Sequence, residues 1–152
     1  MKTIPELYFM GAAAAEAEHS LTAFDAALLK IGIGDCNLIR VTSILPPGCK
    51  EAPQGFRFPD GALVPTVYGV ATSSTPGELV AAAVGIGFSE DSFGVLMEHS
   101  GTLSAEEARS KIEEMIKEAF EIRNMELKGM KISSIEHRVK KAGAAVAAVA
   151  LW

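Results

Sequence analysis

The chain has 152 residues, of which 49% are hydrophobic and 22% charged, as is typical of one globular domain. Its 14 basic and 19 acidic side chains leave a net charge of −5, which argues against a nucleic-acid or anionic-membrane surface. No stretch approaches the ~20 apolar residues of a membrane span, and the N-terminus lacks the shape of a secretory signal. We therefore expect a cytoplasmic protein.

A first amphipathic helix is expected from about Leu21 to Lys30. Ser20 has the chemistry of an N-cap, and Gly32 and Gly34 should end the helix. One apolar face has helical spacing and is formed by Leu21, Phe24, Ala27, Leu28 and Ile31.

A second, stronger helix is expected from about Ala105 to Arg123. Ser104 and Glu107 have the spacing of a capping box, and an acidic first turn suits the positive end of a helix. The core-facing stripe predicted for this helix is Ala108, Ile112, Met115, Ile116, Ala119 and Phe120.

Most of the remaining chain has the pattern of β-strands. Strands are expected near residues 6–13, 36–45, 62–72, 79–88, 93–100, 130–138 and 143–151. Pro65 should make the third of these an edge or bulged strand, because proline cannot donate to a sheet ladder. Many strands with two helices predict an α+β domain, in which helices cover a mainly antiparallel sheet arrangement.

The cysteines do not indicate a metal centre. Cys36 and Cys49 match no zinc-ligand spacing, and only three scattered histidines accompany them. A disulfide is compatible with the sequence, but two buried free thiols are favoured because a cytoplasmic protein is kept reduced.

The run NLIRVTSILPP at 37–47 combines an apolar, strand-like pattern with a Thr-Ser pair and two closing prolines. Together with LTAFDAALLKIGIGDC upstream, it resembles the self-processing site of the pyruvoyl-dependent arginine decarboxylases. The resemblance continues through GALVPTVYG at 61–69, PGE at 76–78, LMEHSG at 96–101 and IEHRVKKAGAAVAAVALW at 135–152. One departure is that the family usually breaks at Ser-Ser, whereas this chain has Thr42-Ser43.

The resemblance implies an αββα sandwich and a homotrimer, or a hexamer of paired trimers, with active sites between neighbouring subunits. It also implies one domain, residues 1–152, that cleaves itself into a β chain of residues 1–42 and an α chain of residues 43–152. Ser43 would become a covalent pyruvoyl cofactor, whose ketone condenses with the substrate amine as a Schiff base and withdraws electrons. The substrate would be arginine, and no metal, nucleic acid or membrane would be needed.

The resemblance also assigns roles to individual side chains. Glu98 would be the general acid, Asn37 would orient the scissile carbonyl or the substrate carboxylate, and Asp25 would meet the substrate guanidinium. Leu21, Leu28 and Gly34 match the pocket wall more weakly.

Local sequence by itself favours plainer roles for these residues. Ser43 reads as a strand hydroxyl, Glu98 as a strand-end glutamate and Asp25 as a solvated helix residue, while helical spacing makes Leu21 and Leu28 core residues. Because adjacent strand side chains face opposite ways, His99 is not assigned to the site of Glu98.

Two other functions remain open from the sequence. One is a pyruvoyl decarboxylase for another basic amino acid, since one carboxylate at Asp25 does not separate arginine from lysine or ornithine. The other is a non-catalytic trimeric homologue that is never processed.

Overall fold

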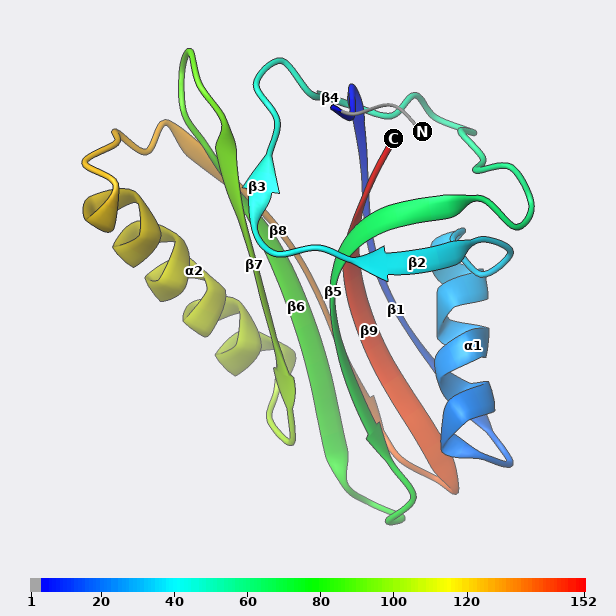
Figure 1. Ribbon diagram of the computed structural model, residues 1–152. Helices are drawn as coiled ribbons and strands as arrows, with labels where there is room; N and C mark the ends of the chain where they lie inside the picture. The colour runs from blue at the N-terminus through cyan, green and yellow to red at the C-terminus, as the bar shows by residue number, and fades with distance from the viewer. Residues whose placement is uncertain (1–3) are drawn as a thin grey trace.

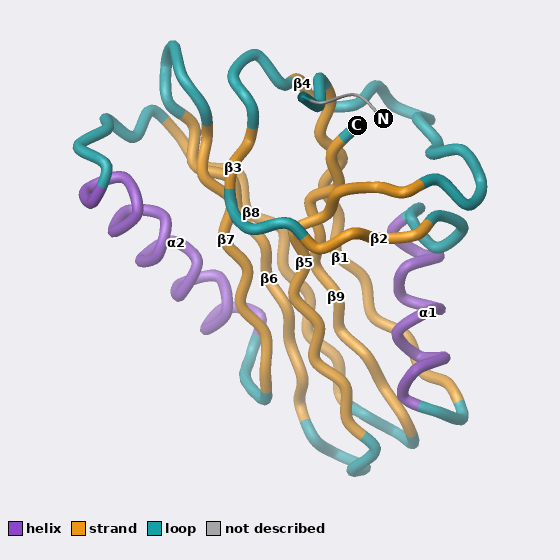
Figure 2. Tube along the Cα trace, in the orientation of Figure 1, coloured by secondary structure: helices purple, strands orange, loops and turns teal. Residues whose placement is uncertain are grey.

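Two β-sheets lie face to face between two helices in the computed structural model, which describes residues 4–152 (Figure 1). The five-stranded sheet has the order β2 (Asn37–Arg40), β5 (Leu63–Ser73), β9 (Ala142–Leu151), β1 (Leu7–Ala17) and β4 (Lys50–Glu51). The four-stranded sheet has the order β3 (Ile44–Leu45), β7 (Gly94–Gly101), β6 (Leu79–Phe88) and β8 (Gly129–Arg138). Helix α1 (Ser20–Ile31) covers the first sheet and α2 (Ala105–Ile122) covers the second, so the predicted αββα sandwich is confirmed (Figure 2).

Strand β9 shows how small side chains allow this layering. Its alternate residues Ala145, Ala147 and Val149 lie in the core between the sheets, whereas Val146 and Ala148 lie in the core beneath α1. All of β9 is buried, as a strand covered on both faces must be. The alanine-rich composition therefore reflects close packing of a central strand.

Strand β6 plays the same part in the second sheet. Val80, Val84 and Ile86 pack between the sheets, and Ala81 and Ala83 lie in the core beneath α2. The stripe predicted for α2 is confirmed in this layer, where five of its residues are buried and Met115 is partly buried: Ala108, Ile112, Ile116, Ala119 and Phe120.

The ends of the helices agree only in part with expectation. Ser104 caps α2 by accepting the Glu107 N–H at 3.1 Å, and Gly32 ends α1 with a left-handed backbone, φ 101°. The N-cap prediction for Ser20 is wrong, because α1 begins at Ser20 and its N-cap is His19, which makes no side-chain cap bond.

The core assignment of Leu21 is also wrong. Its side chain is 75% exposed, because α1 packs on the sheet through a stripe that begins at Ala23 and continues with Ala27, Leu28 and Ile31. Leu28, at 8% exposure, is in the core as expected.

Two strand predictions are corrected by the sheet topology. The expected strand 36–45 is two strands in different sheets: β2 pairs in parallel with β5, and β3 pairs antiparallel with β7. The prediction that Pro65 marks an edge or bulged strand is wrong, because β5 lies between β2 and β9. Pro65 is tolerated because it is opposite Ile39 of β2, one residue before the pairing with β9 begins.

Candidate active site

Residues 41–43 carry the chain from one sheet to the other. On one side of this crossing the Val41 N–H donates to the Thr66 carbonyl in β5 at 3.2 Å. On the other side the Ser43 carbonyl accepts from the Leu96 N–H in β7 at 2.8 Å. Thr42 is exposed and Ser43 half-buried. The Thr42–Ser43 peptide is therefore anchored at both ends, by one hydrogen bond to each sheet.

Glu98 lies on β7, two residues beyond Leu96 and on the same face of the strand. The register places Glu98 opposite Val84, in the core between the sheets, and His99 opposite Ala83, in the core beneath α2. The two side chains thus face opposite ways, as expected. Glu98 is on the side of β7 where residues 41–43 cross between the sheets.

Gly69 on β5 makes room for the Glu98 side chain. A Cβ added at Gly69 would lie 3.4 Å from Glu98 Cγ and 3.5 Å from Glu98 Cβ, in van der Waals contact. The carboxylate side chain is 35% exposed. Glu98 therefore lies against the backbone of β5, partly sheltered from water by both sheets.

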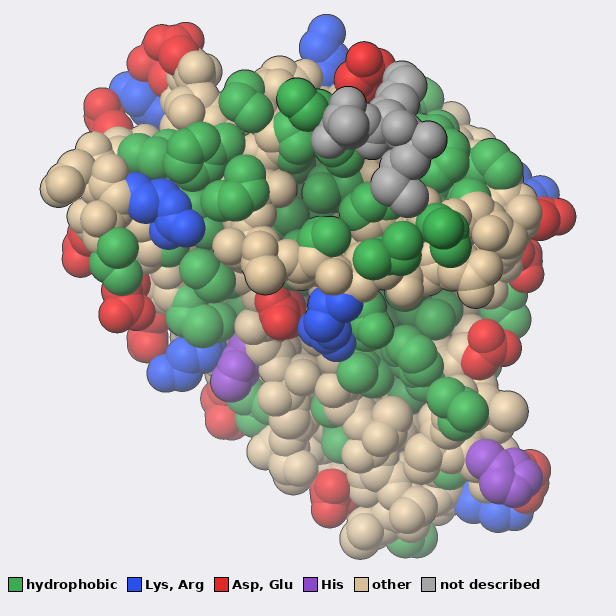
Figure 3. Space-filling view, viewed as in Figure 1, with side chains coloured by type: hydrophobic (Ala, Val, Ile, Leu, Met, Phe, Trp, Pro, Cys, Tyr) green, Lys and Arg blue, Asp and Glu red, His purple; other side chains and the backbone are tan. Residues whose placement is uncertain are grey.

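Arg40, which sequence reasoning missed, connects this carboxylate to the end of β2. Its Nη1 lies 3.7 Å from Glu98 Oε1 and donates to the Tyr68 carbonyl at 2.8 Å. The guanidinium also lies 4.0 Å from the centroid of the Tyr68 ring, a cation–π contact. Figure 3 shows basic and acidic atoms side by side on this face of the molecule. The available signal was a single charged residue in an apolar run, three positions before Ser43.

Helix α1 reaches the same group of side chains through an aromatic contact. Phe24 stacks on Tyr68, with ring centroids 6.2 Å apart, so Phe24, Tyr68 and Arg40 form a continuous row from α1 to β2. The neighbouring Asp25 is exposed and makes no ion pair among the described residues 4–152. Its carboxylate is thus available to a ligand or to another subunit.

Asn37 and Gly34 lie at the other end of β2 from the crossing. The Asn37 side chain donates from Nδ2 to the Gly61 carbonyl at 3.1 Å, which ties the start of β2 to the loop before β5. A Cβ at Gly34 would lie 2.8 Å from the Leu29 Cα, so glycine is needed there for a close backbone approach. Within one chain, neither residue is brought to Ser43 and Glu98.

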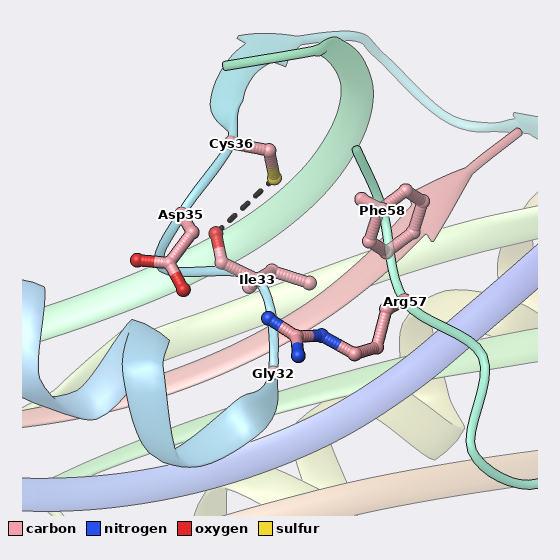
Figure 4. Close-up of a pocket in the computed structure, with 6 residues that line it drawn as sticks. All are labelled: Gly32, Ile33, Asp35, Cys36, Arg57 and Phe58. Atoms are coloured by element: carbon pink, nitrogen blue, oxygen red, sulfur yellow. Dashed lines mark hydrogen bonds between the residues drawn. The ribbon is translucent and has the colours of Figure 1, made fainter. Parts of the chain in front are cut away.

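A small hollow lies beside these residues, between the end of α1 and the loop before β5 (Figure 4). It is lined by Gly32, Ile33, Asp35, Cys36, Arg57 and Phe58. Cys36 Sγ donates to the Ile33 carbonyl at 3.2 Å, and burial raises the pKa of this thiol. A raised pKa favours the thiol over the reactive thiolate, so Cys36 is suited to packing.

The remaining candidates for special chemistry are the two cysteines and His137. Cys36 and Cys49 are both free thiols, as the sequence favoured, but each is only partly buried rather than buried. His137 Nε2 lies 2.6 Å from Glu16 Oε1, which joins β8 to the end of β1.

Neither of the two helices within residues 4–152 is long and apolar enough to cross a membrane.

Ser43 and Glu98 carry the functional groups that a self-processed ketone centre would use. Ser43 is half-buried and its carbonyl accepts from the Leu96 N–H, and Glu98 follows Leu96 by two residues on β7, on the face toward the other sheet. A hydroxyl at a peptide bond is the precursor that such a group needs, and a nearby carboxyl can move a proton.

Comparison with known proteins gives a consistent result over the whole chain. The model of a family described as pyruvoyl-dependent arginine decarboxylase matches residues 7–152. Curated proteins of that name include one from Methanocaldococcus jannaschii, 43% identical over 98% of this chain and 91% of its own length. The one from Pyrococcus abyssi is 43% identical over 99% of this chain and 97% of its own length. The one from Pyrococcus furiosus is 44% identical over 97% of this chain and 96% of its own length.

Proposed function

The chain belongs to the pyruvoyl-dependent arginine decarboxylase family, and on this basis we propose that it decarboxylates arginine to agmatine and carbon dioxide after cleaving itself between Thr42 and Ser43. The observation that carries the proposal is the match to the family over residues 7–152, and the hydrogen bond from the Leu96 N–H to the Ser43 carbonyl, two residues before Glu98 on β7, supports it. We further propose a cytoplasmic location, where thiols such as those of Cys36 and Cys49 stay reduced.

Cleavage would begin with attack of Ser43 Oγ on the Thr42 carbonyl carbon, which breaks the peptide C–N bond and forms an ester. Elimination then takes the Ser43 Cα proton and breaks the Cβ–Oγ bond, so that Thr42 leaves as a carboxylate that keeps the former Ser43 oxygen. Water releases ammonia from the dehydroalanine left at 43 and produces the pyruvoyl group. The hydrogen bonds at Val41 and Ser43 support this chemistry, because they hold both sides of the bond during the attack.

The pyruvoyl group would supply the electron sink that decarboxylation of an amino acid requires. Glu98 would supply a proton to the substrate Cα after carbon dioxide leaves. Its location between the sheets restricts water on one side while leaving the carboxyl partly exposed to a substrate. General acid catalysis of this kind contributes about 10²- to 10⁴-fold to a rate.

We assign the substrate guanidinium to Asp25, whose carboxylate offers paired charge-assisted hydrogen bonds. Leu21, Leu28 and Gly34 would belong to the same pocket. Leu21 is exposed, whereas Leu28 is buried and Gly34 is closely packed on Leu29, so these two would act through the shape of the pocket wall. Asn37 would orient the scissile carbonyl or the substrate carboxylate.

A homotrimer, alone or paired as a hexamer, accounts for the separation of these residues from Ser43. Asp25 and Leu21 are exposed on α1, whereas Ser43 and Glu98 lie at the junction of the sheets. Large apolar side chains are also exposed on β2, β3 and β5: Ile39 at 38%, Ile44 at 41% and Leu63 at 53%. Burying such side chains against a neighbour would join the α1 residues of one subunit to the Ser43 of the next.

The first test is the intact mass of the denatured protein. Chains 1–42 and 43–152, the larger one lighter by one ammonia than its sequence, would support the proposal, and the Ser43→Ala variant should remain whole and inactive. Ser134→Ala, at another half-buried strand serine, should cleave normally. Turnover of arginine by Ser43→Ala would contradict the pyruvoyl mechanism.

The second test separates cleavage from catalysis. Glu98→Gln should cleave normally, with kcat lower by about 10²- to 10⁴-fold. Glu113→Gln is a matched control, because Glu113 also pairs with an arginine, at 3.9 Å, but lies on α2. Wild-type turnover by Glu98→Gln would remove Glu98 from the role of acid, and preference for lysine or ornithine over arginine would support the alternative substrate class.

A further inference from the structure

Arg40 occupies a position that links the scissile bond to the candidate acid. It is the last residue of β2, two residues before Thr42, and its guanidinium lies 3.7 Å from the Glu98 carboxylate. The hydrogen bond to the Tyr68 carbonyl at 2.8 Å and the contact with the Tyr68 ring keep it there. Arg40 is therefore an oriented cation, although its side chain is 52% exposed.

Self-cleavage would change the charge around this cation. Before cleavage, the charges of Arg40 and Glu98 sum to zero when both side chains are ionised. Cleavage turns the Thr42 carbonyl into a carboxylate, so the same place then holds one positive and two negative groups. Residues two apart on an extended chain are separated by about 7 Å, which the long arginine side chain can span. The new carboxylate is thus within reach of Arg40.

We propose that Arg40 is a positioning residue that, after cleavage, is shared between the Thr42 carboxylate and Glu98, so that cleavage itself favours the protonated form of Glu98. The inference rests on the proposed cleavage at Thr42–Ser43. Two carboxylates near one cation hold a proton more readily than one carboxylate paired with that cation. A protonated Glu98 is the form that a general acid needs, so the enzyme would acquire its acid in the step that creates its cofactor.

Arg40 is the charged side chain that pairs with Glu98, and the other groups around the Glu98 carboxylate in the described part of the chain are uncharged. Among residues 4–152, β5 presents the Tyr68 carbonyl and Gly69, β6 presents Val84, and on β7 the Ser100 hydroxyl donates to the Val70 carbonyl. His99 faces the other side of β7. Tyr68 is the other titratable side chain of this group, and Asp25 follows Phe24, which stacks on Tyr68.

The direct test is the titration of the Glu98 carboxyl before and after cleavage. Its ¹³C resonance, assigned by its loss in Glu98→Gln, would be followed with pH in the uncleaved Ser43→Ala chain and in the processed wild type. The proposal expects a midpoint about one pH unit higher in the processed protein, a shift typical of one added charge at this range. Equal midpoints, or a lower one after cleavage, would overturn it.

The second test removes the cation. In Arg40→Gln the processed site would carry two negative charges without a counter-ion, so the alkaline limb of the kcat–pH profile should move up by about one unit. Arg40→Lys keeps the charge and should retain the wild-type limb. Arg109→Gln is the matched control, because Arg109 is 49% exposed, lies 3.9 Å from Glu113 and bonds a backbone carbonyl, yet sits on α2.

Each outcome of this test decides the proposal. The proposal would be overturned if the alkaline limb of the kcat–pH profile stayed in place in Arg40→Gln. It would also be overturned if that limb moved equally in Arg40→Lys, because a purely structural role lowers kcat without regard to charge. Failure of the Arg40→Gln chain to cleave would also overturn the proposal, because Arg40 would then act in the cleavage reaction itself. The mass of the wild type separates this from failure of the proposed function, since an uncleaved wild type refutes that function first.

Discussion

The contact between Gly85 and Ile112 offers a test of how tightly α2 is packed on the four-stranded sheet. Ile112 is fully buried, and a Cβ added at Gly85 of β6 would lie 2.4 Å from its Cγ2 and 2.9 Å from the Cδ1 of Ile116. Ile112→Ala removes three side-chain carbons, worth roughly 2.5 kcal/mol of transfer free energy at about 0.8 kcal/mol per methylene. With the cavity that remains, the free energy of unfolding should fall by about 3–4 kcal/mol.

Gly85→Ala alone should cost about 1–3 kcal/mol, because the new methyl group overlaps Ile112. In the double variant the added methyl occupies the space that Ile112 has left. The double variant should therefore lose about 1–2 kcal/mol less than the sum of the single losses. Gly85→Ala combined with Val146→Ala is the matched control, because Val146 is buried in the other layer, beneath α1, and these losses should add.

The assay is urea denaturation followed by circular dichroism, at one fixed protein concentration because association would shift the midpoint. It should be made in the Ser43→Ala background, so that every variant unfolds as one continuous chain. Strictly additive losses for Gly85→Ala and Ile112→Ala would refute the claim that these two side chains compete for the same space.

Three further predictions concern other parts of the fold. Ser104→Ala should reduce the free energy of unfolding by about 1 kcal/mol through loss of the α2 cap, whereas Ser110→Ala, inside the same helix, should change it by less than about 0.5 kcal/mol in urea denaturation. The pKa of Glu16 is lowered from 4.5 to about 2, first by the Lys140 N–H that donates to its carboxylate and then by His137. The contribution of Glu16 to stability is therefore present above pH 4.5 and is lost as the pH falls toward 2. The Tm measured from pH 6 to 2 should fall less steeply in Glu16→Gln than in the wild type, and parallel curves would contradict this assignment. Leu28→Ala should cost about 2–5 kcal/mol in urea denaturation of the subunit. Leu21→Ala should leave subunit stability within about 0.5 kcal/mol but weaken the proposed trimer in sedimentation, and an unchanged association state would remove Leu21 from the proposed interface.

The site illustrates which residues sequence reasoning can find. Ser43 and Glu98 were proposed through the family's motifs, and alternation along a strand was enough to predict that Glu98 and His99 face opposite ways, as the register of β6 and β7 confirms. Arg40 was not found, because the contacts that single it out are with Tyr68 and Glu98, which are 28 and 58 positions away in the chain. Local sequence has no means of bringing these three together.

Periodicity determined much of the fold, since hydrophobic spacing and end signals are local. The stripe and cap of α2, the end of α1 at Gly32 and most strands of this α+β protein follow from such patterns. Tertiary structure alone decided that the run 36–45 divides between two sheets, that β5 is an inner strand despite Pro65, and that Leu21 remains exposed. Propensity records whether a residue suits an extended or helical backbone, whereas these outcomes depend on which distant strand supplies the hydrogen bonds and which surface covers the side chain.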